Sequence, residues 1–319
     1  MKKILTILGI ISILGGINKA EGQLIPQFSQ YMFNGLYINP AYAGYKDVFY
    51  GHIMYRKQWV DISSSPRTAL VSIDSPLKGG SNLGLVYAND KAGAAYSNNV
   101  MIDYAYRFPV SKTGRLSFGL SAGMIQHGLN QSELRDEDGN LDSRVQNIKT
   151  VWKPAIDAGV YFDSEYFYLG ASVVGILKGK RDLESFQMIR NQANYFVTLG
   201  GVIPLMDNLK LLPSTLWGSD FENPLKIDLN MMIMIADRFS VGGSYRTGTL
   251  WFSDVSDNVR LRDAIVLIAE AFVSERLRLG FAYDFDLNKL TTGHNGGFEI
   301  SLGYYLTKSK QRYVTPRYF

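Results

Sequence analysis

The chain has 319 residues, of which 46% are hydrophobic and 13% aromatic, and it carries a formal net charge of +4 and no cysteine. Disulfides and thiol-ligated metals are therefore excluded, and the small, scattered positive charge argues against a nucleic-acid surface. The 20 tyrosines and 31 glycines are typical of strands with interfacial ends rather than of a soluble α/β core.

The first 22 residues have the three parts of a secretory signal peptide. A basic start, Met1-Lys2-Lys3, precedes an apolar run over residues 4–17 and the small-x-small site Ala20-Glu21-Gly22. The apolar run is too short to be a stable membrane anchor, and no second long run follows it, which excludes helical membrane spans. We expect cleavage after Gly22 and export, without a lipid-modified cysteine.

Residues 26–44 carry no charge and are rich in aromatic and amide side chains. Such a stretch is not a solvated linker, and Asn34 and Asn39 need partners where it is buried because an unpaired buried amide costs about 1–3 kcal/mol. It is either tucked into the fold for stability alone or it is a plug or docking segment, which would span residues 23–47. The candidate plug or docking residues in this stretch are Phe28, Gln30, Tyr31, Phe33, Asn34, Asn39, Pro40, Tyr42 and Gly44.

From residue 48 onward, apolar and aromatic residues alternate with polar, charged or small ones. This period of two is typical of strands with one face in apolar surroundings. We count about fourteen such segments, an even number within the range of bacterial outer-membrane barrels. They begin near Val48, Thr68, Asn82, Tyr96, Leu116, Trp152, Tyr166, Tyr195, Leu209, Leu225, Phe239, Ala264, Leu277 and Phe298. The predicted fold is all-β, a transmembrane antiparallel barrel over residues 48–307, followed by a periplasmic tail over residues 308–319.

The length of a connection depends on whether it follows an odd-numbered or an even-numbered strand. The short connections are 75–80, 109–114, 163–165, 205–208, 236–238 and 274–276, and the long polar ones are 128–150, 178–192, 248–263 and 286–295. Transmembrane barrels have this pattern of short periplasmic turns and long outer loops, whereas a soluble sandwich has no reason for it. The parity places residues 26–44 on the periplasmic side, within reach of the lumen or a periplasmic partner but hardly of the cell surface.

Other side chains are assigned by the same alternation. Aromatic residues at the ends of the outward faces should form interfacial girdles, for example Tyr104, Tyr106, Trp152, Tyr161 and Trp217. The histidines, His52, His127 and His294, have no metal-ligand spacing and are expected at surface or rim positions. The lumen-side charges either pair across the interior or line a pore; they are Asp103, Arg107, Asp157, Lys226, Asp228, Arg246, Glu270, Arg278, Asp284 and Glu299.

Two motifs resemble functional sites but fit poorly. Residues 119–123 match the G-x-S-x-G pattern of a nucleophile elbow, which needs a strand-to-helix turn, yet here the alternation continues on both sides, so Gly and Ser are interpreted as small lumen-facing residues. The acidic stretch 135–142 resembles a calcium loop without its full ligand set, and a solvated Asp-Gly turn is the simpler interpretation. Its Asp136, Asp138 and Asp142 are nevertheless the candidate outer-loop contacts for a partner or for a calcium ion, and no other cofactor is expected.

Three sequence features together resemble the PorP/SprF family of the type IX secretion and gliding-motility machinery. They are Pro26-Gln27-Phe28-Ser29-Gln30-Tyr31-Met32-Phe33-Asn34, then Ile38-Asn39-Pro40-Ala41-Tyr42-Ala43-Gly44, then Arg56-Lys57-Gln58-Trp59 with Pro66 and Thr68 after it. The resemblance adds Arg56, Gln58 and Trp59 to the candidate docking residues, and Gly35 stands where a proline or another bulkier residue would be expected. Asn39-Pro40-Ala41 also resembles the plug motif of FadL-type barrels, which are similarly fourteen-stranded.

The resemblance implies a non-enzymatic outer-membrane barrel, surrounded by outer-membrane lipid, that works with secretion components. The implied partners are the periplasmic PorK/PorN ring, a PorE-like linker and a secreted adhesin-like protein that the barrel anchors or helps to export. The alternative is a FadL-like or porin-like passive channel for small solutes. A surface hydrolase is disfavoured because no catalytic constellation is compatible with the strands.

Overall fold

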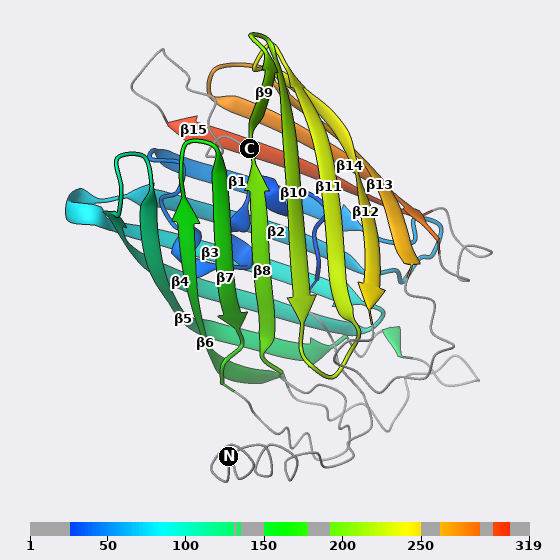
Figure 1. Ribbon diagram of the computed structural model, residues 1–319. Coiled ribbons are helices and arrows are strands. Elements are labelled where there is room, and N and C mark those ends of the chain that lie inside the picture. The colour runs from blue at the N-terminus through cyan, green and yellow to red at the C-terminus, as the bar shows by residue number, and fades with distance from the viewer. Residues whose placement is uncertain are drawn as a thin grey trace, which may run out of the picture.

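The computed structural model describes residues 26–130, 133–134, 150–177, 192–249, 262–287 and 296–306. Its strands form one antiparallel sheet that closes into a barrel (Figure 1). The strands are β1 Phe49–Lys57, β2 Arg67–Pro76, β3 Ser81–Ala92, β4 Ala95–Pro109, β5 Arg115–Leu129, β6 Val151–Asp163, β7 Phe167–Val174, β8 Asn194–Gly201, β9 Ile203–Met206, β10 Leu209–Ser219, β11 Leu225–Ile235, β12 Phe239–Thr249, β13 Arg262–Phe272, β14 Leu277–Asp286 and β15 Gly297–Leu306.

The closed barrel has fourteen strands, because β8 and β9 act as one. Only Val202 separates them in sequence, and both pair with β10. Every other strand pairs with its neighbours in the chain, β10 pairs with β11, and β1 pairs with β15 to join the first strand to the last. Each predicted strand start lies within two residues of an observed one, so the predicted fold class is confirmed.

The alternation along each strand separates two faces. On β4, Ile102 is 60% exposed on the outer face, whereas its neighbour Asp103 is buried inside. Of the predicted girdle residues, Tyr104, Tyr106, Trp152 and Trp217 are exposed on the outer face as expected. No helix among the described residues is long and apolar enough to cross a membrane.

The prediction for Tyr161 was wrong. Tyr161 is buried in the interior, in the same unbroken strand β6 as the exposed Trp152. The two residues are nine positions apart, an odd number, so the period of two puts them on opposite faces.

The six connections predicted to be short lie at one end of the barrel, since each follows a strand that runs toward that end. We call this the short-turn end, and the opposite one the outer end. Strand β1 begins at the short-turn end, where the chain enters it from residue 48. The long connections at the outer end lie mostly outside the described residues, and so do residues 1–22 and 308–319, for which signal peptide and tail remain predictions.

Candidate functional site

Residues 26–47, which we call the lumen segment, lie inside the barrel (Figure 1). From residue 28 to residue 44 every residue except Tyr37 is buried, as expected for an uncharged aromatic stretch. The segment folds into three short 3-10 turns, η1 Tyr31–Phe33, η2 Gly35–Tyr37 and η3 Pro40–Tyr42. It fills the space between strands on opposite sides of the barrel, for example β2 on one side and β6 and β7 on the other.

Asn34 and Asn39 begin the second and third turns, and each caps its turn. The side-chain oxygen of Asn34 accepts a hydrogen bond from the Leu36 backbone N–H at 3.4 Å, and that of Asn39 accepts one from Ala41 at 2.9 Å. Asn is a preferred N-cap residue because its short side chain can satisfy a free N–H at the start of a turn. Both amides therefore have the partners that their burial requires.

The same two amides also tie the segment to the barrel wall. Asn34 Nδ2 donates to Ser72 Oγ at 2.7 Å and lies 3.0 Å from His52 Nδ1. Asn39 Nδ2 donates to the backbone carbonyls of Val160 at 3.1 Å and Ala171 at 3.3 Å, on β6 and β7. Each asparagine thus joins a turn of the segment to two neighbouring positions of the wall.

Inward-facing glycines make room for this close approach. A Cβ added to Gly119 would lie 2.1 Å from the Ala41 backbone nitrogen, and one added to Gly159 would lie 2.1 Å from Asn39 Oδ1. Gly119 belongs to the G-x-S-x-G stretch, which lies within β5. Its glycine is needed for contact with the lumen segment, so that stretch is not a nucleophile elbow.

At the outer half of the barrel, one buried ionic cluster holds the start of the segment. Arg56 on β1 pairs with Asp284 on β14 and Glu299 on β15. The Glu299 carboxylate also accepts hydrogen bonds from the backbone N–H groups of Ser29 at 2.7 Å and Gln30 at 3.1 Å. Because Arg56 and both carboxylates are almost fully buried, the cluster depends on these contacts for the solvation that water would otherwise supply.

A second arginine extends the cluster along the same wall. Arg246 on β12 pairs with Asp228 on β11 at 2.8 Å and donates to Ser29 Oγ at 2.9 Å. Gln27 of the segment donates to the other Asp228 oxygen at 2.6 Å. The Ser29 hydroxyl in turn donates to Asp284 at 3.0 Å. Ser29 therefore contacts both the Arg56–Asp284 pair and the Arg246–Asp228 pair.

Arg278 holds the middle of the segment through an aromatic and a carbonyl contact. Its guanidinium carbon lies 4.5 Å from the centre of the Phe33 ring, and its Nη2 donates to the Tyr50 hydroxyl at 2.7 Å and, more weakly, to the Phe33 carbonyl at 3.4 Å. Glu270 on β13 lies 3.7 Å from Arg278 Nε. Such a cation–π contact is strongest when both groups are shielded from water.

At the short-turn end the segment is held by its backbone. The Gly44 N–H donates to Asp74 Oδ1 at 2.8 Å, and Arg107 donates to the Ala43 carbonyl at 3.1 Å. Gly44 has a φ of 70°, a conformation that suits glycine. A Cβ at Gly44 would also lie 2.1 Å from Asn82 Oδ1, so no larger residue fits there.

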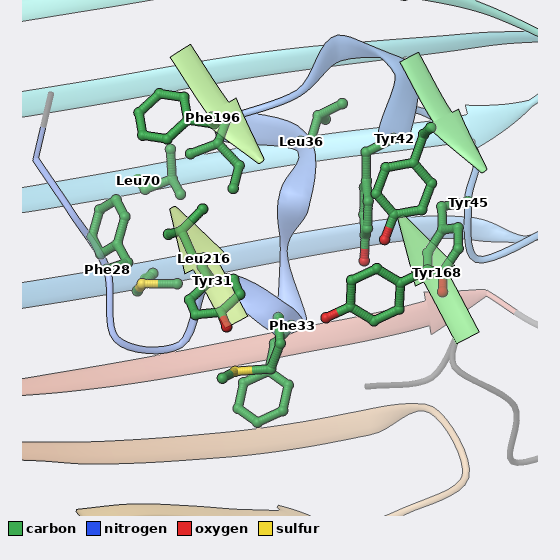
Figure 2. Packing of buried hydrophobic residues seen from close by; sticks show 14 of the residues in the cluster. Phe28, Tyr31, Phe33, Leu36, Tyr42, Tyr45, Leu70, Tyr168, Phe196 and Leu216 are labelled. Carbon is green, nitrogen blue, oxygen red and sulfur yellow. The ribbon is translucent and has the colours of Figure 1, made fainter. Parts of the chain in front are cut away.

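Aromatic packing fills the space between these polar contacts. Tyr42 and Tyr45 of the segment pack against Tyr161, with ring centres 5.5 and 5.1 Å away, and Tyr161 stacks on Tyr168 at 5.7 Å. Figure 2 shows the segment side chains between strands of the two walls.

The segment runs through the barrel from the outer half to the short-turn end. Ser29 contacts Glu299, which lies near the outer end of β15, whereas Ala43 contacts Arg107 near the short-turn end of β4. Of the two places that the sequence left open to the stretch, the lumen and a periplasmic partner, the segment occupies the lumen. Residue 48 lies at the short-turn end, and the chain that precedes it turns back through the barrel interior.

The other candidate residues are more scattered. Arg56 belongs to the ionic cluster, whereas Gln58 and Trp59 follow β1 in the outer loop and are half-buried. Asp136, Asp138 and Asp142 lie outside the described residues, so a calcium ion or a partner there remains a prediction. Within the described ranges, no group of His, Asp or Glu side chains could hold a metal ion.

Two smaller expectations need correction. His52 is buried against Asn34, not at a surface or rim position, because it lies on the inward face of β1. The bulkier residue expected in place of Gly35 does not fit this structure, because a Cβ there would lie 2.6 Å from the Tyr42 ring. His294 lies outside the described residues.

The lumen-side charges face inward as predicted. Nine of the ten are buried, and Lys226 is half-buried. The residues that sequence reasoning missed are Gln27, Ser29, Gly119 and Gly159. Gly119 was assigned to the inward face but not to a contact with the lumen segment, and Gly159 could have been assigned in the same way. Nothing in the sequence indicated which residues Gln27 and Ser29 contact.

The sequence also matches a known protein family over most of its length. The family described as "Type IX secretion system membrane protein PorP/SprF" matches residues 20–304. The chain belongs to the PorP/SprF family. This PorP/SprF assignment agrees with the three motifs, of which two lie in the lumen segment and one follows it. No curated protein is similar to the chain at a significant level.

Solved structures with the same architecture include FadL-type barrels. The TodX deltaS2S3 mutant monoaromatic hydrocarbon channel superposes with a TM-score of 0.50 at 11% identity, over 84% of this chain and 92% of that chain. A Pseudomonas aeruginosa FadL homologue superposes with a TM-score of 0.49 at 13% identity, over 90% and 96% of the two chains. The likeness to TodX supports a FadL-like fold. Fold and family together indicate an outer-membrane location and a role in type IX secretion.

Proposed function

We propose that this PorP/SprF protein is a non-enzymatic outer-membrane anchor of the type IX machinery. It holds, or helps to export, one cognate adhesin-like surface protein, and it contacts the PorK/PorN ring and a PorE-like linker from the periplasm. The lumen segment acts as a fixed plug, so the barrel offers surfaces for proteins rather than a path for solutes.

The observation that supports this proposal is the attachment of the lumen segment to several strands. Its start is bound at Asp228, Asp284 and Glu299, and its end at Asp74 and Arg107. A hydrogen bond to a charged group contributes about 1.5–3 kcal/mol. A segment with several such bonds does not leave the lumen readily, which disfavours a passive channel that would need it to move.

The test of the secretion role is deletion of the gene, followed by complementation with the wild-type chain. We expect loss of gliding, or loss of one large adhesin from the cell surface, while outer-membrane integrity stays normal. Complementation should restore both. Intact secretion together with altered uptake of small solutes would contradict the proposal and favour the alternative channel.

The plug is tested separately, by conductance of the purified barrel in a planar bilayer. The wild-type barrel should conduct almost no current, whereas Tyr31→Ala with Phe33→Ala should raise conductance or sensitivity to detergent because both rings are buried in the segment. If instead the barrel keeps its heat resistance and low conductance while partner co-purification falls, the segment is a docking strip. No change in any of these measurements would refute both roles.

A further inference from the structure

A cavity of about 340 Å³ lies in the outer half of the barrel, next to the lumen segment. Leu36 and Tyr37 line the side of the cavity next to the segment, and β3 to β7 supply most of the remaining wall. Cavities of this size are large enough for a small ligand or a single side chain. The three charged residues in its lining are all aspartates, Asp90, Asp103 and Asp157, and no lysine or arginine is found among the described lining residues.

The register of the strands places two of these acids in one row. Asp103 on β4 is opposite Ser121 on β5, which is opposite Asp157 on β6. Their Cα atoms are therefore two strand spacings apart, about 10 Å, and both side chains face inward over Ser121. One cationic group placed above Ser121 can approach both carboxylates.

The wall above this row is apolar. The next inward row, toward the outer end, contains Val86 and Met101 opposite one another, then Gly123 and Ala155. Val86, Met101 and Ala155 line the cavity. The site therefore combines a pair of acids at its inner end with an apolar wall further out.

The two acids differ from the acids that hold the start of the lumen segment. Asp228, Asp284 and Glu299 each pair with an arginine, whereas the ion pairs of the described residues include neither Asp103 nor Asp157. Asp103 is 2% exposed, and its Oδ2 has no hydrogen-bond partner among the described residues. Asp157 is 7% exposed and accepts one bond, from the Gly175 N–H at 2.7 Å.

Nearby basic side chains do not supply the missing charge. Lys153 is on the inward face of β6, two rows further out than Asp157, and the two form no ion pair. His127 lines the cavity, but it lies opposite Ser97, three rows out from Asp103. Burying carboxylates without a cation is costly, so a cationic ligand would gain more here than beside the arginine-paired acids.

We infer that this cavity binds a primary ammonium group on an apolar stem, with the ammonium between Asp103 and Asp157 and the stem against Val86 and Met101. The ligand is either a lysine side chain of a protein or a free aliphatic amine. This inference does not depend on the secretion role, since it rests on the cavity and its charges alone.

The test is calorimetric titration of the purified full-length barrel with n-butylammonium, with butyrate and butan-1-ol as ligands of the same stem. Butylammonium should bind, and butyrate and butanol should not. Asp103→Asn with Asp157→Asn should weaken butylammonium binding by about tenfold or more, because each change removes one buried charge partner. Asp237→Asn, which removes an exposed carboxylate at the short-turn end, should leave it unchanged.

Equal binding of butyrate, no binding of butylammonium, or unchanged affinity in the double variant would overturn the inference. If the double variant does not form a heat-modifiable barrel, Asp157→Asn alone decides, because its remaining oxygen can still accept from Gly175. To separate the two sources, N-acetyl-lysine-N′-methylamide represents a protein side chain and spermidine a free amine. The probe with the lower Kd identifies the source. Its affinity should fall in the aspartate variants by the same factor as that of butylammonium.

Discussion

Glu299→Gln should loosen the lumen segment without removing any volume from the barrel. Glu299 is fully buried and accepts from Ser29 N, Gln30 N and Arg56 Nη1. In the variant one oxygen becomes an NH₂ donor, so at least one of these donors faces another donor. An unsatisfied buried donor costs about 1–3 kcal/mol, and the loss of charge opposite Arg56 raises the total to about 3–5 kcal/mol, although Asp284 still pairs with the guanidinium.

The assay is amide hydrogen exchange of the peptide that contains Ser29 and Gln30. A loss of about 3 kcal/mol corresponds to roughly hundredfold faster exchange. Asp237→Asn is the control, because its pair with Lys210 is partly exposed and such pairs contribute about 1 kcal/mol or less. If exchange in Glu299→Gln stays within threefold of wild type, the ionic cluster does not hold the segment and the reasoning fails.

Three further changes test other contacts. Gly119→Ala should displace η3 and speed exchange in the segment, since its Cβ would meet the Ala41 backbone at 2.1 Å, whereas Gly51→Ala, with its nearest atom at 3.8 Å, should have no effect. Asn39→Ala removes a turn cap and two bonds to strand carbonyls, so segment stability should fall by about 1–2 kcal/mol; exchange equal to wild type would contradict this. Ile102→Arg places a charge on the lipid face and should destabilise the barrel by about 2–4 kcal/mol in urea unfolding from lipid vesicles, and an unchanged midpoint would mean that this face is not in the bilayer.

The barrel could be predicted from the sequence because alternation is a local signal that repeats. Each strand start was found within two residues, and the buried face of each strand followed from the same count. The alternation also gives the correct face for Tyr161, because its odd separation from the outward-facing Trp152 places it inside the barrel. His52 was likewise on the inward face of β1.

The path of the lumen segment was less predictable. Its composition indicated burial, and Asn34 and Asn39 were recognised as amides that need partners. Which partners they have depends on long-range contacts, such as that of Ser29 with Glu299, and no local pattern encodes these. The acid pair at Asp103 and Asp157 was similarly hidden, because only the register across β4, β5 and β6 aligns it.

The ionic cluster also has a consequence for the order in which the protein assembles. Asp284 and Glu299 belong to the last two strands, Arg56 to the first, and Ser29 to the chain that precedes it. The two carboxylates obtain Arg56 only when β1 and β15 meet, and they obtain the Ser29 contacts only when the lumen segment is inside. Joining the first and last strands and enclosing the lumen segment therefore satisfy the same atoms, so an intermediate with an open seam lacks both stabilising contributions at once.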